Sequence, residues 1–239
     1  MVIGMQIKNY KLKIVKTLLM FIGILYLIFL YMDIFNIQIF IPTDIIKFIS
    51  IILTFIISLL LEEYAINAKG IFLLQLGLFL TIFADLFLLV LNRKYILGIA
   101  LFCIIQILYS IRYDSHRTKA TIINFITIFL ILIIIYITME VDFIFVISIY
   151  YIICLLTSTI RGIRVCTDKL YPSPNRQMIA LGMIFFLFCD INVGFFNIIG
   201  YMEPAGKYIN LLHNISSISI WLFYLPSQVL LCISEHIFK

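Results

Sequence analysis

Charged side chains are scarce in this sequence. Asp, Glu, Lys and Arg make up only 12% of the 239 residues, whereas 64% are hydrophobic. A soluble domain is about one quarter charged, so this chain lacks the polar side chains needed to cover a water-facing surface. The composition excludes a soluble enzyme, a nucleic-acid-binding protein and a disordered chain. It predicts a helical integral membrane protein, and its continuous rather than alternating apolar runs exclude a membrane β-barrel.

The sequence also lacks the usual motifs of catalytic and cofactor sites. It has no GxSxG, Walker A or GxGxxG pattern, and its three histidines show no HExxH spacing. A metal site needs at least three well-placed ligands, so we expect no metal and no other cofactor. The five cysteines form no CxxC pair and most lie inside apolar runs, which is typical of buried, small apolar residues. They are Cys103, Cys154, Cys166, Cys189 and Cys232.

Eight apolar runs approach the roughly 20 residues that a membrane-spanning helix needs. They cover residues 15–38, 44–61, 70–91, 95–112, 119–138, 143–163, 177–199 and 211–234, with breaks such as the one at Glu203–Gly206. The first run is too long for a signal peptide and no small-residue cleavage site follows, so we interpret it as a retained span. The chain is therefore predicted to be all-α, a single polytopic transmembrane domain over residues 1–239.

The basic residues are distributed unevenly between the two predicted sides of the membrane. The side of the termini carries four in the N-terminal segment, Lys69, three at 112–119, four at 161–176, and Lys239. The opposite side carries only Arg93, Lys94 and Lys207. Because cytoplasmic loops are rich in Lys and Arg, both termini are predicted to be cytoplasmic. The few, short loops suggest a bacterial plasma membrane.

The third and seventh runs resemble each other. LGLFLTIFADLFLLVLN at 76–92 aligns without a gap with LGMIFFLFCDINVGFFN at 181–197, which superposes Asp85 on Asp190. The fourth and eighth runs align so that Gln106 falls on Gln228. Chance similarity among Leu-, Ile- and Phe-rich helices is the alternative. The coinciding polar residues favour two parallel four-helix halves, 1–116 and 117–239, of a kind found in membrane proteins.

Asp85 and Asp190 are the most costly side chains to bury in this chain. A carboxylate near the bilayer centre costs about 2.5–3.5 kcal/mol on insertion scales. Both lie at similar distances from the predicted cytoplasmic ends of their helices, so they could face each other. Each could be a structural hydrogen-bonding group, but the matched depth and repeat position favour a catalytic pair.

Four further polar residues within the spans are candidates for substrate binding. Gln106 and Tyr109 lie one turn apart on one helical face, and Gln228 takes the place of Gln106 in the second half. Asn192 lies two residues after Asp190. The alternatives are interhelical hydrogen bonds for Gln106 and anchoring near the membrane interface for Tyr109. We interpret Tyr150 and Tyr151 as packing residues.

Lys47 lies one turn inside the outer end of the second run and is a fifth candidate for substrate binding. It could extend to the lipid headgroups. It could instead pair with Asp85 and hold that carboxyl ionised, which would leave Asp190 as the acid.

The pattern resembles that of the YhhN/TMEM86 family of lysoplasmalogenase-like membrane proteins. The resemblance covers most of the chain and is most specific over residues 84–113. The first family signature is matched by Asp85, Gly98, Phe102, Gln106 and Tyr109. The second is matched by Gly182, Phe185 or Phe186, Cys189 and Asp190, while Lys47 and Gln228 match further family positions. Cys189 replaces the usual Ser, and Phe48 replaces the Pro that commonly follows the Lys.

The resemblance implies hydrolysis of the vinyl-ether bond of a lysophospholipid, a lysoplasmalogen, to a fatty aldehyde and a glycerophospho-alcohol. A vinyl ether must first accept a proton on its outer alkene carbon, which creates an oxocarbenium ion that water captures. This chemistry needs one protonated carboxyl and one carboxylate, and two neighbouring carboxyls in a low-dielectric cavity suit it, as they do in glycosidases. Asp85 and Asp190 are the expected pair.

Three other interpretations stay open from the sequence. Parallel repeats with one acid in each half are also typical of an ion- or proton-coupled transporter. A hydrolase resembling alkaline ceramidases would need a histidine cluster for zinc, which this chain lacks. A structural membrane protein could use the two aspartates as a hydrogen-bonded pair. No nucleic acid partner is expected, and the sequence predicts no oligomeric state.

Overall fold

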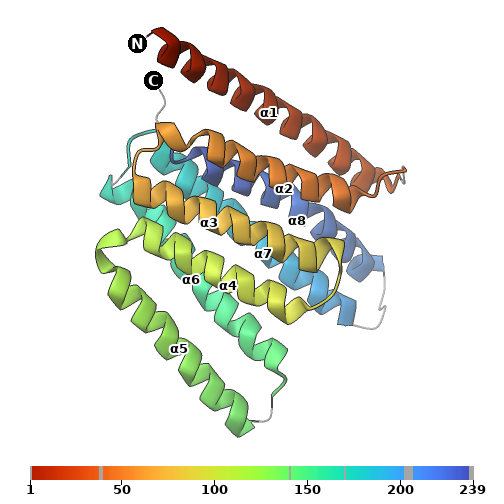
Figure 1. The fold of residues 1–239 in the computed structure, drawn as a ribbon. Helices are drawn as coiled ribbons and strands as arrows, with labels where there is room; N and C mark the ends of the chain where they lie inside the picture. The colour runs from red at the N-terminus through yellow and green to blue at the C-terminus, as the bar shows by residue number, and fades with distance from the viewer. Residues whose placement is uncertain (1, 38–39, 140, 170, 202–206, 237–239) are drawn as a thin grey trace.

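The computed structural model describes residues 2–37, 40–139, 141–169, 171–201 and 207–236 and is a bundle of eight long helices (Figure 1). All eight are long and apolar enough to cross a membrane, which confirms the predicted all-α polytopic class. The expected break at Glu203–Gly206 includes residues outside the described ones. The helices are α1 (Val2–Phe35), α2 (Thr43–Leu60), α3 (Ala68–Asp85), α4 (Tyr95–Tyr113), α5 (Thr118–Met139), α6 (Phe143–Asp168), α7 (Asn175–Tyr201) and α8 (Lys207–Ile233).

Helices α1 and α5 lie at opposite edges of the bundle (Figure 1). The α1 helix packs against α2 and α8, and α5 packs against α4 and α6. Only 6% of the most apolar stretch of α5 is buried inside the protein, so this helix presents nearly all of its apolar side chains to lipid. The α1 helix begins, and α8 ends, at the same end of the bundle, as an even number of spans requires.

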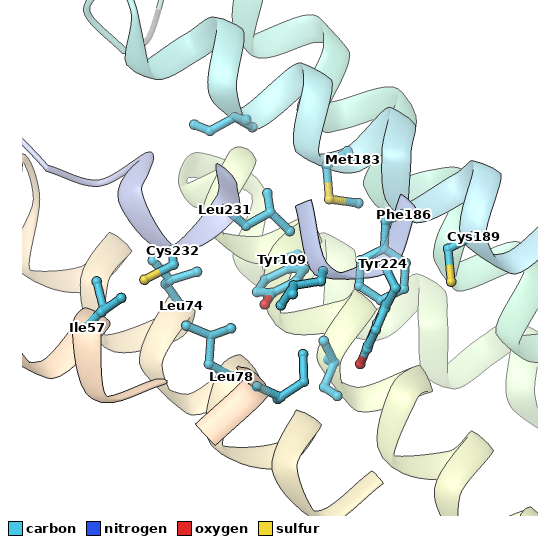
Figure 2. Close-up of a cluster of buried hydrophobic side chains, with 14 of the residues drawn as sticks. Ile57, Leu74, Leu78, Tyr109, Met183, Phe186, Cys189, Tyr224, Leu231 and Cys232 are labelled. Atoms are coloured by element: carbon cyan, nitrogen blue, oxygen red, sulfur yellow. The ribbon is translucent and has the colours of Figure 1, made fainter. Parts of the chain in front are cut away.

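The buried side chains in Figure 2 come from α2, α3, α4, α7 and α8, and Tyr109 of α4 lies among them. The Tyr109 ring on α4 packs beside Leu74 and Leu78 of α3 and Leu231 of α8. It can approach α3 closely because Gly77 has no side chain: a Cβ there would lie 2.7 Å from a Tyr109 ring carbon. The ring packing explains why a glycine stands at this position of α3.

Helix neighbours correspond between the two halves of the chain. The α4 helix packs against α5 and α6, and α8 packs against α1 and α2. The last helix of each half therefore lies against the first two helices of the other half. The internal repeat and its boundary at 116–117 stay predictions.

The chain changes its helical geometry directly after Asp85. Residues Leu86–Val90 form a π-helix, in which the Leu91 amide donates to the Leu86 carbonyl at 2.9 Å. Such single π-turns are rare and occur frequently at functional sites. The π-turn packs against Gly98 of α4, where any Cβ would overlap the Leu88 side chain.

Pro226 interrupts the hydrogen-bond ladder of α8. Proline has no amide hydrogen, so the Leu222 carbonyl one turn earlier loses its helical partner. The Tyr26 hydroxyl of α1 donates to this carbonyl at 3.0 Å. A broken backbone bond in α8 thus becomes an attachment point for α1.

A buried ion pair joins α4 to the segment after α8. Arg112 donates to Glu235 from Nη2 at 2.7 Å and from Nε at 3.2 Å, and also to the Ser234 hydroxyl at 2.7 Å. The Asn175 amide donates to the Ser234 carbonyl at 2.8 Å. These bonds tie the last described residues to α4 and α7 at the end of the bundle where the termini lie.

Candidate functional site

Asp85 is the last residue of α3 and is almost fully buried, at 5% exposed. The Tyr224 hydroxyl of α8 donates to it, with distances of 3.0 Å to Oδ1 and 2.9 Å to Oδ2. A buried carboxyl needs such a partner because an unpaired polar group in an apolar interior is costly. The contact joins the first and second halves of the chain at this carboxyl.

Asp190 of α7 is half-buried and is held in the same way. The Tyr151 hydroxyl of α6 donates to its Oδ2 at 2.5 Å. Each predicted catalytic aspartate therefore has a tyrosine hydroxyl as its partner. Among the described residues, neither aspartate forms an ion pair with Lys, Arg or His.

Both tyrosines pack around one ring, Phe102 of α4. The Phe102 centroid lies 6.1 Å from that of Tyr151 and 6.4 Å from that of Tyr224. Phe102 therefore links the two aspartates through their tyrosine partners, Tyr224 for Asp85 and Tyr151 for Asp190. The candidate site draws on α3, α4, α6, α7 and α8.

Gln106, Tyr109 and Gln228 lie deeper in the bundle and are fully buried. The Ser158 hydroxyl of α6 donates to Gln106 Oε1 at 2.5 Å, an interhelical bond of the kind expected as the alternative role. The Gln106 amide nitrogen, the Tyr109 hydroxyl and both amide atoms of Gln228 have no hydrogen-bond partner among the described residues. Anchoring of Tyr109 at the membrane interface is wrong, because its side chain is enclosed in the core.

Asn192 forms a hydrogen bond within its own helix. Its side-chain amide donates to the Phe188 carbonyl one turn earlier on α7, at 2.8 Å. This bond is local to the helix. A role for Asn192 in substrate binding stays a prediction.

The alternative pairing of Lys47 with Asp85 is wrong. The Lys47 ammonium lies 2.9 Å from Asp33 of α1 and 3.6 Å from Asp44 of α2. Lys47 is only 6% exposed, so it does not extend to the lipid headgroups either. Because Asp33 is its partner, Lys47 supplies no reason to prefer Asp190 over Asp85 as the acid.

Sequence reasoning missed the two tyrosines that hold the aspartates. The packing role expected for Tyr150 and Tyr151 leaves out the Tyr151 hydroxyl, which donates to Asp190. The hydroxyl of its neighbour Tyr150 donates to the Phe125 carbonyl at 3.2 Å. Helical spacing offered one signal, since Tyr224 lies one turn before Gln228 and Phe102 one turn before Gln106. Nothing in the sequence pattern marks Tyr151.

The described residues contain no group of three or more His, Cys, Asp or Glu placed to hold a metal ion. The five cysteines are free, and four of them are buried. What converges at the site is therefore two carboxyls, two phenolic hydroxyls and aromatic rings. Such a set can donate and accept protons and can surround a cation with π-faces.

Comparison with known proteins gives one match. A family model described as the YhhN family matches residues 43–234, a range that includes α2 to α8 and leaves α1 outside. No curated protein matches the chain, and no solved structure does. Because the match covers most of the sequence and includes both aspartates and the tyrosines that hold them, the chain belongs to the YhhN family.

Proposed function

We propose that this integral membrane protein is a hydrolase that cleaves the vinyl-ether bond of lysoplasmalogens. The products are a fatty aldehyde and a glycerophospho-alcohol. One observation carries the proposal: two intramembrane carboxyls, each held by a tyrosine hydroxyl, meet at one aromatic cluster in a chain of the YhhN family. Family membership agrees with a hydrolase and leaves the reaction to be tested.

The reaction begins with proton transfer from one aspartic acid to the outer alkene carbon of the vinyl ether. The carbon–carbon double bond supplies the electron pair, and an oxocarbenium ion forms at the carbon bonded to the ether oxygen. Water adds to that carbon and loses a proton to the site. The carboxyl that took this proton gives it to the glycerol oxygen as the carbon–oxygen bond of the hemiacetal breaks. The hemiacetal hydroxyl gives its own proton to the first aspartate, so the aldehyde is released and both carboxyls regain their starting protonation states.

The second aspartate is ionised when the substrate binds and has two tasks in this scheme. It stabilises the oxocarbenium ion electrostatically, and it accepts the proton of the attacking water, as a carboxylate does in glycosidases. Phe102, Tyr151 and Tyr224 offer their ring faces to the same cation. Tyr151 and Tyr224 also fix the orientation of the carboxyls, which keeps proton donor and acceptor aimed at the substrate.

The substrate reaches the site from the bilayer in this proposal. Asp190 is half-buried, and its neighbours Phe188 and Ile191 are 46% and 43% exposed on the apolar surface of α7. A lysolipid with one long chain can therefore bring its first alkenyl carbons to Asp190 while the rest of the chain stays in lipid.

Aldehyde release by the purified full-length protein tests the proposal. The substrate is a lysoplasmalogen, and the control lipid is the saturated alkyl-ether analogue, which has no alkene to protonate. Asp85→Asn and Asp190→Asn each remove one carboxyl, and Asp142→Asn, at the start of α6 outside the site, is the matched control. We expect release from the vinyl ether alone, retained in Asp142→Asn and lost in the other two variants.

The possible outcomes distinguish the carboxyl-pair mechanism, another hydrolytic mechanism and proton-coupled transport. Release that survives both site variants overturns the carboxyl-pair mechanism, and no release by folded protein overturns the function in favour of proton-coupled transport. The pH dependence of any residual rate shows which aspartate is the acid and which is the base. The wild-type rate should fall at low pH, where the base is protonated, and at high pH, where the acid is ionised. The variant without the base should lose the fall at low pH, and the variant without the acid should lose the fall at high pH.

A further inference from the structure

The turn of α8 that carries Tyr224 lacks one of its helical hydrogen bonds. Pro226 has no amide hydrogen to donate, so the Leu222 carbonyl has no partner at the next turn of its own helix. Proline is a common cause of sharp helix kinks for this reason. Tyr224 lies midway between these two residues and is the hydrogen-bond partner of Asp85. The direction of its hydroxyl therefore depends on how this turn is held.

Helix α1 supplies the donor that α8 lacks. The Tyr26 hydroxyl donates to the Leu222 carbonyl at 3.0 Å. The Leu222 side chain is 41% exposed on the apolar surface, and lipid offers no water to replace a missing partner. A carbonyl in this position needs a donor from the protein itself, and Tyr26 provides it.

A second contact from the same face of α1 holds the residue beside Leu222. Phe29 lies three residues after Tyr26, so the two side chains are neighbours on the surface of α1. The Phe29 ring is fully buried and packs edge-on against the Trp221 ring, with centroids 5.8 Å apart. Trp221 packs edge-on against Tyr224 at 5.1 Å. Helix α1 thus restrains this turn through its backbone and through its rings.

We infer that Tyr26 is a positioning residue of the carboxyl site. Its hydroxyl holds the turn that Pro226 interrupts, which keeps the Tyr224 hydroxyl aimed at Asp85. Tyr26 acts on the reaction through Tyr224 and needs no contact with the substrate. The inference rests on the function proposed above.

The role assigned to α1 goes beyond what the family match conveys. The match begins at residue 43, whereas α1 ends at Phe35. The Tyr224 and Asp85 that α1 positions both lie inside the matched region. The first helix of this chain is therefore a working part of the site and not only an apolar addition at the edge of the bundle.

Tyr26→Phe removes the hydroxyl and keeps the ring. We expect kcat for aldehyde release to fall roughly 3- to 10-fold, as the loss of one neutral hydrogen bond allows. The KM for the lysoplasmalogen should stay unchanged, because the proposed entry of the substrate is along α7. Tyr31→Phe is the matched control, since Tyr31 is 56% exposed on the same helix; it should keep the wild-type kcat.

Two further backgrounds separate positioning from a general loss of structure. Pro226→Ala restores an amide hydrogen for the Leu222 carbonyl, so the helix can close its own turn. Tyr224→Phe removes the hydroxyl that is being positioned. In either background we expect Tyr26→Phe to change kcat by less than about twofold, because the interaction it acts through has been replaced or removed. A purely structural role for Tyr26 would give the same loss in all backgrounds.

Trp221 reports on the same turn without any reaction, because it is the single tryptophan of the chain. The time-resolved fluorescence anisotropy of the full-length protein in detergent measures nanosecond motion of this side chain. We expect Tyr26→Phe to increase that motion and Pro226→Ala, added to Tyr26→Phe, to return it to the wild-type value. Tyr31→Phe should leave it unchanged.

A folded Tyr26→Phe variant with the wild-type kcat would overturn the inference, as would equal losses of kcat in the three backgrounds. Its failure is separable from failure of the proposed function. If the wild type releases no aldehyde, the hydrolase is refuted, while greater motion of Trp221 in Tyr26→Phe still supports the restraint by α1. If the wild type releases aldehyde and Tyr26→Phe changes neither kcat nor this motion, the positioning role alone is refuted.

Discussion

Removal of the Tyr224 hydroxyl is the most direct perturbation of the proposed site. Among the described residues, this hydroxyl is the hydrogen-bond partner of both Asp85 oxygens, at 3.0 and 2.9 Å. Asp85 is only 5% exposed, so bulk water cannot readily replace the lost donor. A hydrogen bond to a charged group contributes about 1.5–3 kcal/mol, and about 1.4 kcal/mol corresponds to a tenfold change in rate. We therefore expect Tyr224→Phe to lower kcat roughly 10- to 100-fold.

The fold should survive this change, because the ring of residue 224 keeps its edge-on contacts with Trp221 and Phe186. Aldehyde release from a lysoplasmalogen is the assay, with the thermal unfolding midpoint in detergent as the check on folding. Tyr150→Phe is the matched control, since Tyr150 is equally buried but its hydroxyl donates to a backbone carbonyl of α5. We expect the control to keep wild-type kcat. A folded Tyr224→Phe variant with the kcat of the wild type would refute the role assigned to this hydrogen bond.

Three further predictions concern the bundle around the site. Glu235→Gln leaves the buried Arg112 guanidinium without its counter-ion. Loss of one partner from such a pair costs about 3–5 kcal/mol, so the thermal unfolding midpoint should fall. A midpoint equal to that of the wild type would contradict this prediction. Gly98→Ala places a Cβ against Leu88 and should displace the π-turn that follows Asp85. Aldehyde release should therefore fall well below that of Gly194→Ala, whose Cβ would meet open space. Equal rates in the two variants would contradict a role for the π-turn. Gln228→Leu replaces a buried amide that has no hydrogen-bond partner among the described residues, an arrangement that costs about 1–3 kcal/mol. The unfolding midpoint should therefore rise or stay level, and a clear fall would show that the amide is satisfied in the membrane.

The helices could be predicted from the sequence because hydrophobic length alone identifies a membrane span. The eight expected runs coincide with the eight helices apart from a few residues at their ends. The largest difference is α1, which begins at Val2 rather than near residue 15. Its first turns carry lysines, so they added nothing to the hydropathy signal, although they continue the same helix.

The aspartates could be singled out because a carboxyl inside an apolar run is costly, and the cost itself is the signal. Their tyrosine partners carried no such signal. The chain has 14 tyrosines and 22 phenylalanines, and an aromatic residue in a span is unremarkable whether it packs against lipid or donates to a carboxyl. Only the fold separates Tyr151, which holds Asp190, from Tyr150, which joins two helices.

The error over Lys47 has a physical cause. A lysine one turn inside a span needs an anion, and Asp85 was the nearest conspicuous candidate in a neighbouring span. Asp33 lies near the end of the first run, where a charged residue is unremarkable. The turn between α1 and α2 brings it to 2.9 Å from the ammonium, and such a pairing depends on the course of that turn rather than on the polarity of either span.

The acidic side chains discussed above fall into two groups, those paired with a cation and those held by a tyrosine hydroxyl. Glu235 is paired with Arg112 and Asp33 with Lys47, so each of these carboxyls has a cationic partner. Asp85 and Asp190 are instead held by neutral hydroxyls, which fix their position without supplying a positive charge. A carboxyl held in this way can give up and regain a proton, which a general acid must do in every turnover. Had Lys47 been the partner of Asp85, a cation would have fixed that carboxyl as the carboxylate of the pair. Because Lys47 pairs with Asp33 instead, the hydrogen-bond partner of each aspartate is a neutral hydroxyl, and either could be the acid of the proposed pair.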